Sequence, residues 1–250
     1  MPFTISHAAA AWPFEKSRLV LSAVVIGAMA PDLEYFLPFG ITGRWTHSFA
    51  GMFEFCLPAT LLLLAAFHGV LKRPVVALFP ERIQQRIIIE PFRYWPMSRF
   101  LLVVGSALTG IATHLAWDSF THPEGWMVER IAWLQLTHTL FGNRVWANYK
   151  FAQYGSTVLG LILLVLWFRA WYWKAPARSQ VEPRLSARAR AAVICSILAI
   201  AFVTGLVRAW TTVGPDPLQV AFIATDVVSF MIVSALGLLI FSVALRVWEQ

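Results

Sequence analysis

The chain has 250 residues, of which 58% are hydrophobic and only 13% are charged. A soluble domain is typically about 45–50% apolar and about 25% charged, so this composition excludes an ordinary soluble enzyme and a disordered chain. The remaining class is an integral membrane protein, in which a net charge of +7 usually reports topology rather than nucleic-acid binding. We therefore expect the lipid bilayer, and no nucleic acid, as a partner.

Five apolar segments are long enough to cross a bilayer, because a membrane helix needs roughly 20 apolar residues. In chain order they are Phe49–Leu71, Arg99–Phe120, Gly155–Tyr172, Ala191–Arg208 and Val220–Leu245. A sixth segment, Leu19–Ala30, would reach only about two thirds of the hydrocarbon thickness. It could be a short span, a re-entrant helix or a helix lying against the others. The predicted fold is an all-α polytopic membrane bundle of five or six transmembrane helices.

Basic residues are unequally distributed among the connecting segments. Most of them follow Phe49–Leu71 and Gly155–Tyr172 or lie near the chain ends, whereas residues 209–219 contain none. The positive-inside rule then predicts a multi-pass protein of the cytoplasmic (inner) membrane, with both termini in the cytoplasm and residues 119–154 outside.

All six histidines precede Gly155, so the chemistry is expected in the first part of the chain. We expect a membrane-embedded domain over residues 1–173, a basic cytoplasmic linker over 174–190 and a C-terminal transmembrane helix pair over 191–250. Within that pair, Asp226 is expected to form an ion pair with Arg208 on the preceding span.

The stretch ATHLAWDSFTHPEGW, residues 112–126, places histidine and aspartate at helical spacing. His114 and Asp118 are four residues apart and share one helix face, so both side chains could bind one metal ion. His122 continues that face one turn later. Zinc, manganese and iron all accept such ligands, and zinc is the divalent ion that we expect. The alternative is a polar helix end in which Asp118 is merely paired with His114.

Other residues on the outer side could complete this site. Asp32 follows a helix-breaking proline and could be a ligand or only a helix N-cap, while His47 lies at the outer end of the next span. Glu54, seven residues after His47, should face the same way. It could orient a ligand histidine, act as a general base or be a protonated core residue. His7 would lie inside with six crossings, yet would reach the outer cluster if Leu19–Ala30 is re-entrant.

Four motifs resemble a family of bacterial membrane proteins. They are MPFTISHAAA, VIGAMAPDLEYF, THSFAG-x-FEFCLP and THLAWDSFTHPEGW, and together they extend from Met1 to about Trp173. In order and spacing they resemble the family called domain of unknown function 4184. The motif order is also similar to that of membrane-bound proteins labelled as metal-dependent hydrolases, although Glu34 stands where that set has the second Asp of PD-x-D. The resemblance implies metal positions at His7, Asp32, His47, His114 and Asp118.

These observations favour a membrane-bound, metal-dependent hydrolase at the outer face of the cytoplasmic membrane. A metal ion held by the His/Asp cluster would activate a water molecule and polarise an ester or phosphoester oxygen, with Glu54 and Asp118 as the candidate catalytic residues. A site at this depth suggests a lipid or lipid-linked substrate. The alternatives are a transporter or assembly factor whose cluster binds a metal ion or a proton, and a structural scaffold. Polar groups confined to the outer half of the bundle weakly favour the enzyme over the transporter.

Overall fold

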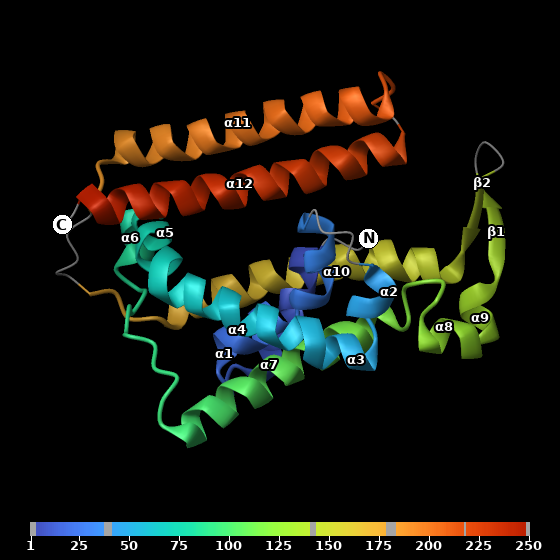
Figure 1. Cartoon of the computed structure of the whole chain (residues 1–250), viewed down its shortest axis with the longest axis horizontal. Coiled ribbons are helices and arrows are strands. Elements are labelled where there is room, and N and C mark those ends of the chain that lie inside the picture. The colour runs from blue at the N-terminus through green and yellow to red at the C-terminus, as the bar shows by residue number, and fades with distance from the viewer. Residues whose placement is uncertain (1–3, 38–41, 141–143, 179–183, 218, 249–250) are drawn as a thin grey trace. The chain divides into compact units, whose positions relative to one another are not determined.

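The computed structural model describes residues 4–37, 42–140, 144–178, 184–217 and 219–248 (Figure 1). Among these residues, helices account for the regular structure except for one antiparallel hairpin, β1 (Thr137–Leu140) and β2 (Arg144–Ala147). Five helices are long and apolar enough to cross a membrane: Phe49–Leu78, Met97–Asp118 (α7), Asn148–Lys174 (α10), Ala187–Val213 (α11) and Val220–Trp248 (α12). The predicted all-α polytopic membrane bundle is confirmed.

The span Phe49–Leu78 contains two wider, π-helical turns. It consists in order of α3 (Phe49–Gly51), η3 (Met52–Cys56), α4 (Leu57–Ala66), η4 (Phe67–Leu71) and α5 (Lys72–Leu78), with η3 and η4 π-helical. Each π turn is followed within three residues by a proline, Pro58 or Pro74. Proline lacks an N–H and clashes with the carbonyl four residues earlier, and a wider turn accommodates it without ending the helix.

The described residues group into two compact units. One comprises Met1–Leu64 and Arg93–Trp173, and the other comprises Ala65–Phe92 and Lys174–Gln250. In the second unit α11 and α12 lie side by side and antiparallel (Figure 1). The expected ion pair between Asp226 and Arg208 is absent from the described residues: Asp226 instead lies against Gly205 of α11, and its buried Oδ1 has no hydrogen-bond partner there. The glycine lets the carboxylate approach the helix backbone closely.

Residues 4–36 of the first unit form a hairpin that runs along α7. The hairpin consists of the 3₁₀ helix η1 (Thr4–Phe14), the helix α1 (Leu21–Gly27) and the 3₁₀ helix η2 (Ala30–Phe36). Midway, the N–H of Val20 donates to Ser106 Oγ over 2.9 Å. Both ends of the hairpin return to the last turn of α7, where His7 and Asp32 lie near Asp118 and His114. Leu21–Gly27 of the predicted sixth segment thus packs along α7, and His7 and Asp32 lie at the same end of α7.

Two glycines let α1 and α7 touch through their backbones. A Cβ atom on Gly110 of α7 would collide with the carbonyl oxygen of Val24, and one on Gly27 of α1 would collide with that of Ala107. Small residues at such contacts are typical of helix pairs in membranes, where close packing replaces the hydrophobic driving force. The contact brings the carbonyl of Ala28 next to His114.

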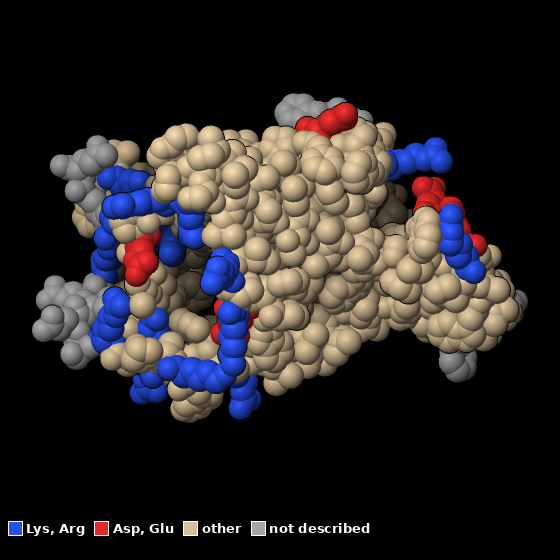
Figure 2. All heavy atoms as spheres, turned by 90° about the horizontal axis from the view of Figure 1, so that it is seen from below, with Lys and Arg blue, Asp and Glu red and all other residues tan. Residues whose placement is uncertain are grey.

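The surface of the protein also has the apolar character of a membrane protein. Figure 2 shows a broad stretch of surface without Lys, Arg, Asp or Glu. Many large apolar side chains on the spans are exposed, among them Leu62, Leu101, Val158 and Ile240. Such a surface matches the hydrocarbon interior of a bilayer rather than water.

Candidate metal centre

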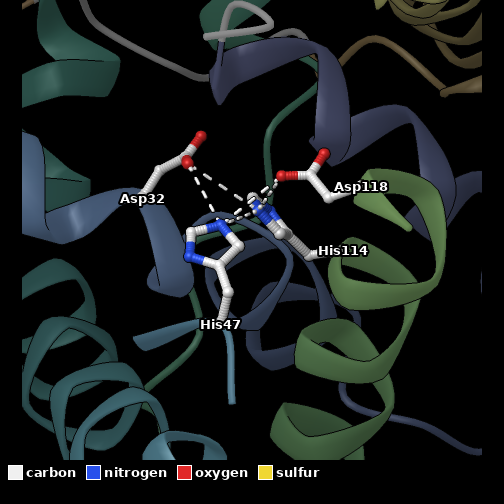
Figure 3. Close-up of side chains that lie close together, drawn as sticks. All are labelled: Asp32, His47, His114 and Asp118. Carbon is white, nitrogen blue, oxygen red and sulfur yellow. Dashed lines mark hydrogen bonds and ion pairs between the residues drawn. The ribbon is translucent and has the colours of Figure 1, made fainter. Parts of the chain in front are cut away.

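Four side chains from three elements converge at the end of α7. Asp32 comes from η2, His47 caps the C-terminus of the short helix α2 (Gly43–Thr46), and His114 and Asp118 come from the last turns of α7. One ligand atom from each residue lies within 4.8 Å of the other three. Figure 3 shows the four side chains pointing toward a common point. His114, Asp32 and Asp118 are buried, whereas the His47 side chain is 23% exposed.

Five of the six separations among these atoms are close to those around a tetrahedral metal ion, and the sixth, between the Asp32 and Asp118 oxygens, is within 4.8 Å. His114 Nε2 lies 3.2 Å from both His47 Nε2 and Asp118 Oδ2, and His47 Nε2 lies 3.4 Å from Asp118 Oδ2. Asp32 Oδ1 lies 3.7 Å from each Nε2 atom. Ligands at about 2.0–2.1 Å from a tetrahedral zinc ion are about 3.3–3.4 Å apart. The site is therefore close to the size that a zinc ion needs.

Hydrogen bonds fix the tautomer of both histidines in this group. Nδ1 of His114 donates to the carbonyl of Ala28 over 2.8 Å, and Nδ1 of His47 donates to the carbonyl of Gly43 over 3.0 Å. Because a carbonyl oxygen only accepts, the proton lies on Nδ1, and each Nε2 presents its lone pair to the cluster. This is the arrangement in which metal-binding histidines are usually held.

With both imidazoles neutral, the four converging atoms are all acceptors, and two further buried acceptors nearby have no hydrogen-bond partner among the described residues. Asp32 Oδ2 and Asp118 Oδ1 are buried and have no hydrogen-bond partner among the described residues. A buried acceptor without a partner costs roughly 1–3 kcal/mol, and such atoms are rare in native structures. Two lone pairs and two carboxylates in one buried place repel one another unless a cation lies between them. The residues present thus fit a divalent metal ion.

His7 lies beside the four-residue cluster and touches two of its members. Its Nε2 is 3.4 Å from Asp118 Oδ1, and its ring stacks on that of His114 with 3.9 Å between the centroids. The side chain is fully buried, and neither ring nitrogen has a hydrogen-bond partner among the described residues. His7 therefore packs against Asp118 and His114, and the N-terminal hairpin brings it there.

His122 also belongs to the site, although the set of metal and catalytic residues predicted from the sequence did not include it. Its Nδ1 lies 3.4 Å from Asp118 Oδ2, and its Nε2 lies 3.1 Å from the amide nitrogen of Gln153. Because that amide nitrogen donates, Nε2 accepts and the Nδ1 proton faces Asp118. Burial lowers the pKa of His122, which favours this neutral form. The signal was present in the sequence, since His114, Asp118 and His122 are spaced by four residues each.

Glu54 does not join the cluster in the structure. Its side chain is exposed, and Oε2 accepts a hydrogen bond from Trp45 Nε1 over 3.2 Å. The seven-residue spacing from His47 does not act as helical spacing, because His47 ends α2 and a new helix begins at Ser48, whose Oγ accepts from the N–H of Gly51. The π turn at Met52–Cys56 shifts the helical phase further.

A partly enclosed pocket of about 680 Å³ adjoins the centre. Its walls include His47, Asp118 and His122 from the cluster, together with Glu34, Arg44 and Trp126. Burial raises the pKa of the Glu34 carboxyl. Pockets that hold small molecules usually have volumes of roughly 300–1,000 Å³, so this one can admit a substrate group to the side of the centre on which His47 is exposed.

Comparison with known proteins identifies the family. A family model described as Domain of unknown function (DUF4184) matches residues 1–243. The match extends well past Trp173, where the motif resemblance ends, so the last two spans belong to the family as well. No curated protein and no solved structure matches the chain. The chain therefore belongs to the family described as Domain of unknown function (DUF4184).

Proposed function

We propose that this protein is a membrane-bound, metal-dependent hydrolase of lipid esters or phosphoesters. The observation that carries the proposal is the convergence of one ligand atom each from Asp32, His47, His114 and Asp118, all within 4.8 Å of one another and beside a pocket. Two nitrogen and two oxygen donors suit zinc, and they also accept manganese or iron. A bound divalent ion would lower the pKa of a water molecule and polarise an ester or phosphoester oxygen.

The protein's own residues would hold and orient this centre. Backbone carbonyls would keep both histidines in the ligand tautomer, and His7 and His122 flank the two oxygens of Asp118. His47 is the ligand that is partly exposed. A substrate in the pocket would therefore approach from the side of His47, while the N-terminal hairpin and α7 would cover the remaining sides.

Its position suggests a substrate that belongs to the membrane. Asp118 is the last residue of the span α7, and His114 lies one turn further in. A group that reaches these residues through the pocket must therefore enter at the level where the span leaves the bilayer. Lipids and lipid-linked molecules carry their ester and phosphoester groups at that depth.

The distribution of basic residues supports a centre at the outer face of the cytoplasmic membrane. In this proposal the N-terminal hairpin is re-entrant, which changes one part of the expected topology. The chain begins at the same end of α7 as Asp118, and five spans then carry it to the opposite side. We therefore assign the N-terminal end to the outer side and the C-terminal end to the cytoplasm, with Lys16 and Arg18 in the turn furthest from the centre.

The test is metal-dependent turnover by purified protein in detergent micelles or liposomes. Phospholipids and lipid-linked phosphoesters are supplied to protein that has been stripped of metal and reloaded with zinc, manganese or iron. Turnover should require the metal and should be lost in His47→Ala and His114→Ala. The exposed His138, which hydrogen-bonds Asn148 outside the cluster, provides the control variant His138→Ala. Metal binding without turnover, combined with uptake into proteoliposomes, would replace the hydrolase by a transporter.

A further inference from the structure

The segment that joins α7 to α10 exposes large apolar side chains. We call residues 119–147 the cap segment; the structure describes 119–140 and 144–147, which contain α8 (Trp126–Arg130), α9 (Ala132–Gln135) and the hairpin β1–β2. Four of these side chains are between 54% and 62% exposed: Trp126, Trp133, Leu136 and Val145. At the right of Figure 2 this segment presents a largely uncharged surface, with its charged side chains toward one edge.

The cap segment is held close to the ends of the two spans that it connects. The N–H groups of Met127 and Val128 both donate to the carbonyl of Ser119, directly after α7. At the other end, Asn148, the first residue of α10, bonds to the carbonyl of Trp133 through its side chain and to that of Leu136 through its N–H. The segment therefore folds back onto the two span ends.

Its chemistry matches the boundary between lipid and water. Tryptophan is concentrated at that boundary because its ring is apolar while its N–H needs a polar partner. The Arg130 guanidinium lies 4.2 Å above the ring of Trp126, a pairing of cation and aromatic ring that suits a zone of phosphate headgroups. Exposed apolar side chains at the ends of membrane spans continue the lipid-facing surface of the spans themselves.

We propose that the cap segment lies in the membrane interface, with Trp133 and Leu136 among the lipid headgroups on the side of the metal centre. Trp126 and Glu129 of this segment also line the pocket that contains His47 and Asp118. The second part of this proposal rests on the proposed hydrolase function: a lipid from the bilayer enters the pocket beside the cap segment without crossing water. The occupant of the apolar surface is thus the bilayer.

The depth of the cap segment can be measured in liposomes without knowledge of the substrate. A fluorophore is attached at Trp133→Cys in a Cys195→Ser background, since Cys56 is buried and Cys195 is exposed. Headgroup spin-labelled phosphatidylcholine and aqueous iodide then serve as quenchers. The control is Glu90→Cys, an exposed charged position in the segment between α6 (Glu81–Gln84) and α7.

At Trp133 the lipid quencher should act more strongly than iodide, and at Glu90 the order should be reversed. Stronger quenching by iodide at Trp133 would overturn the proposal. Protection from both quenchers, with cross-linking between copies through the introduced cysteine, would overturn it in favour of an interface between two copies of the chain.

Entry from the bilayer has its own test. Trp133→Ser combined with Leu136→Ser changes residues that do not line the pocket. This variant should lose turnover of long-chain lipids in vesicles severalfold, while it keeps its metal and its turnover of a water-soluble short-chain analogue. An equal loss with both substrates, or no loss with either, would refute entry beside the cap segment. If the wild-type protein turns over neither substrate, the hydrolase function fails, and the quenching result stands by itself.

Discussion

Gly110 allows the most specific structural prediction, because α7 contains a matched control. A Cβ atom on Gly110 would collide with the backbone carbonyl of Val24 and crowd the N–H of Ala28, whereas one on Gly105 meets nothing within 4 Å. Gly110→Ala therefore has to push α1 away from α7, and Gly105→Ala does not. The shift would also move the Ala28 carbonyl that holds His114.

The magnitude follows from comparing the two variants. Alanine is roughly 0.8–1.0 kcal/mol better than glycine inside a helix, and this gain applies to both positions. Overpacking a close contact costs about 1–3 kcal/mol, and only Gly110→Ala has this cost. Gly110→Ala should thus be less stable than Gly105→Ala by about 1–3 kcal/mol. At roughly 2–4 °C per kcal/mol for a chain of this size, its melting temperature should be lower by several degrees.

Thermal unfolding in detergent measures this difference, and the zinc content of each variant measures the effect on the centre. Gly105→Ala should melt at or slightly above the wild-type temperature and keep its metal. Gly110→Ala should melt lower and bind zinc more weakly, because Ala28 and Asp32 lie on the displaced hairpin. Equal melting temperatures and equal zinc contents would show that the hairpin does not pack on α7 as described.

Three further predictions concern the site and the topology. His122→Phe removes the donor that faces Asp118 and should weaken zinc binding about tenfold, which is the lower end of the usual range for residues that support a metal ligand. Competition with a chelator measures this affinity, and His138→Phe should leave it unchanged. Burial raises the Glu34 pKa above its ordinary value of 4.5, so this carboxyl should destabilise the folded protein once pH rises above that value. Glu34→Gln should therefore be more stable than the wild type at pH 7, with the difference vanishing below about pH 4. Equal unfolding curves of the two proteins at pH 7 would contradict this. Reporters fused to the two ends should map to opposite sides of the membrane, whereas two cytoplasmic ends would restore the six-crossing topology.

Much of the fold follows from local sequence properties. The five spans are long, nearly uniform apolar runs, and such runs have few alternatives to a membrane helix. The joint presence of His114 and Asp118 follows from helical spacing within one continuous helix. Asp32 and His47 were identified because they lie on the same side of the predicted membrane. That prediction depends on the order of the spans and not on the exact helix boundaries.

The remaining features depend on breaks in regular structure that spacing does not reveal. Glu54 was predicted to face the cluster by counting seven residues from His47, but a helix ends and another begins between them. His7 approaches Asp118 only because the chain doubles back, and that hairpin depends on backbone contacts at Gly27 and Gly110. Asp226 contacts Gly205 rather than Arg208. Its neighbour depends on the rotation of α12 about its axis and on the close approach to α11 that glycine allows.

The most direct test of the central claim is the metal content of the purified protein. Elemental analysis after purification without added metal, followed by zinc titration, should give one tightly bound divalent ion per chain in the wild type and in His138→Ala. His47→Ala and His114→Ala should each bind far less, while thermal unfolding shows that at least His47→Ala, whose side chain is partly exposed, remains folded. A wild-type protein that binds no divalent ion, or a folded His47→Ala that binds zinc as tightly as the wild type, would contradict the account.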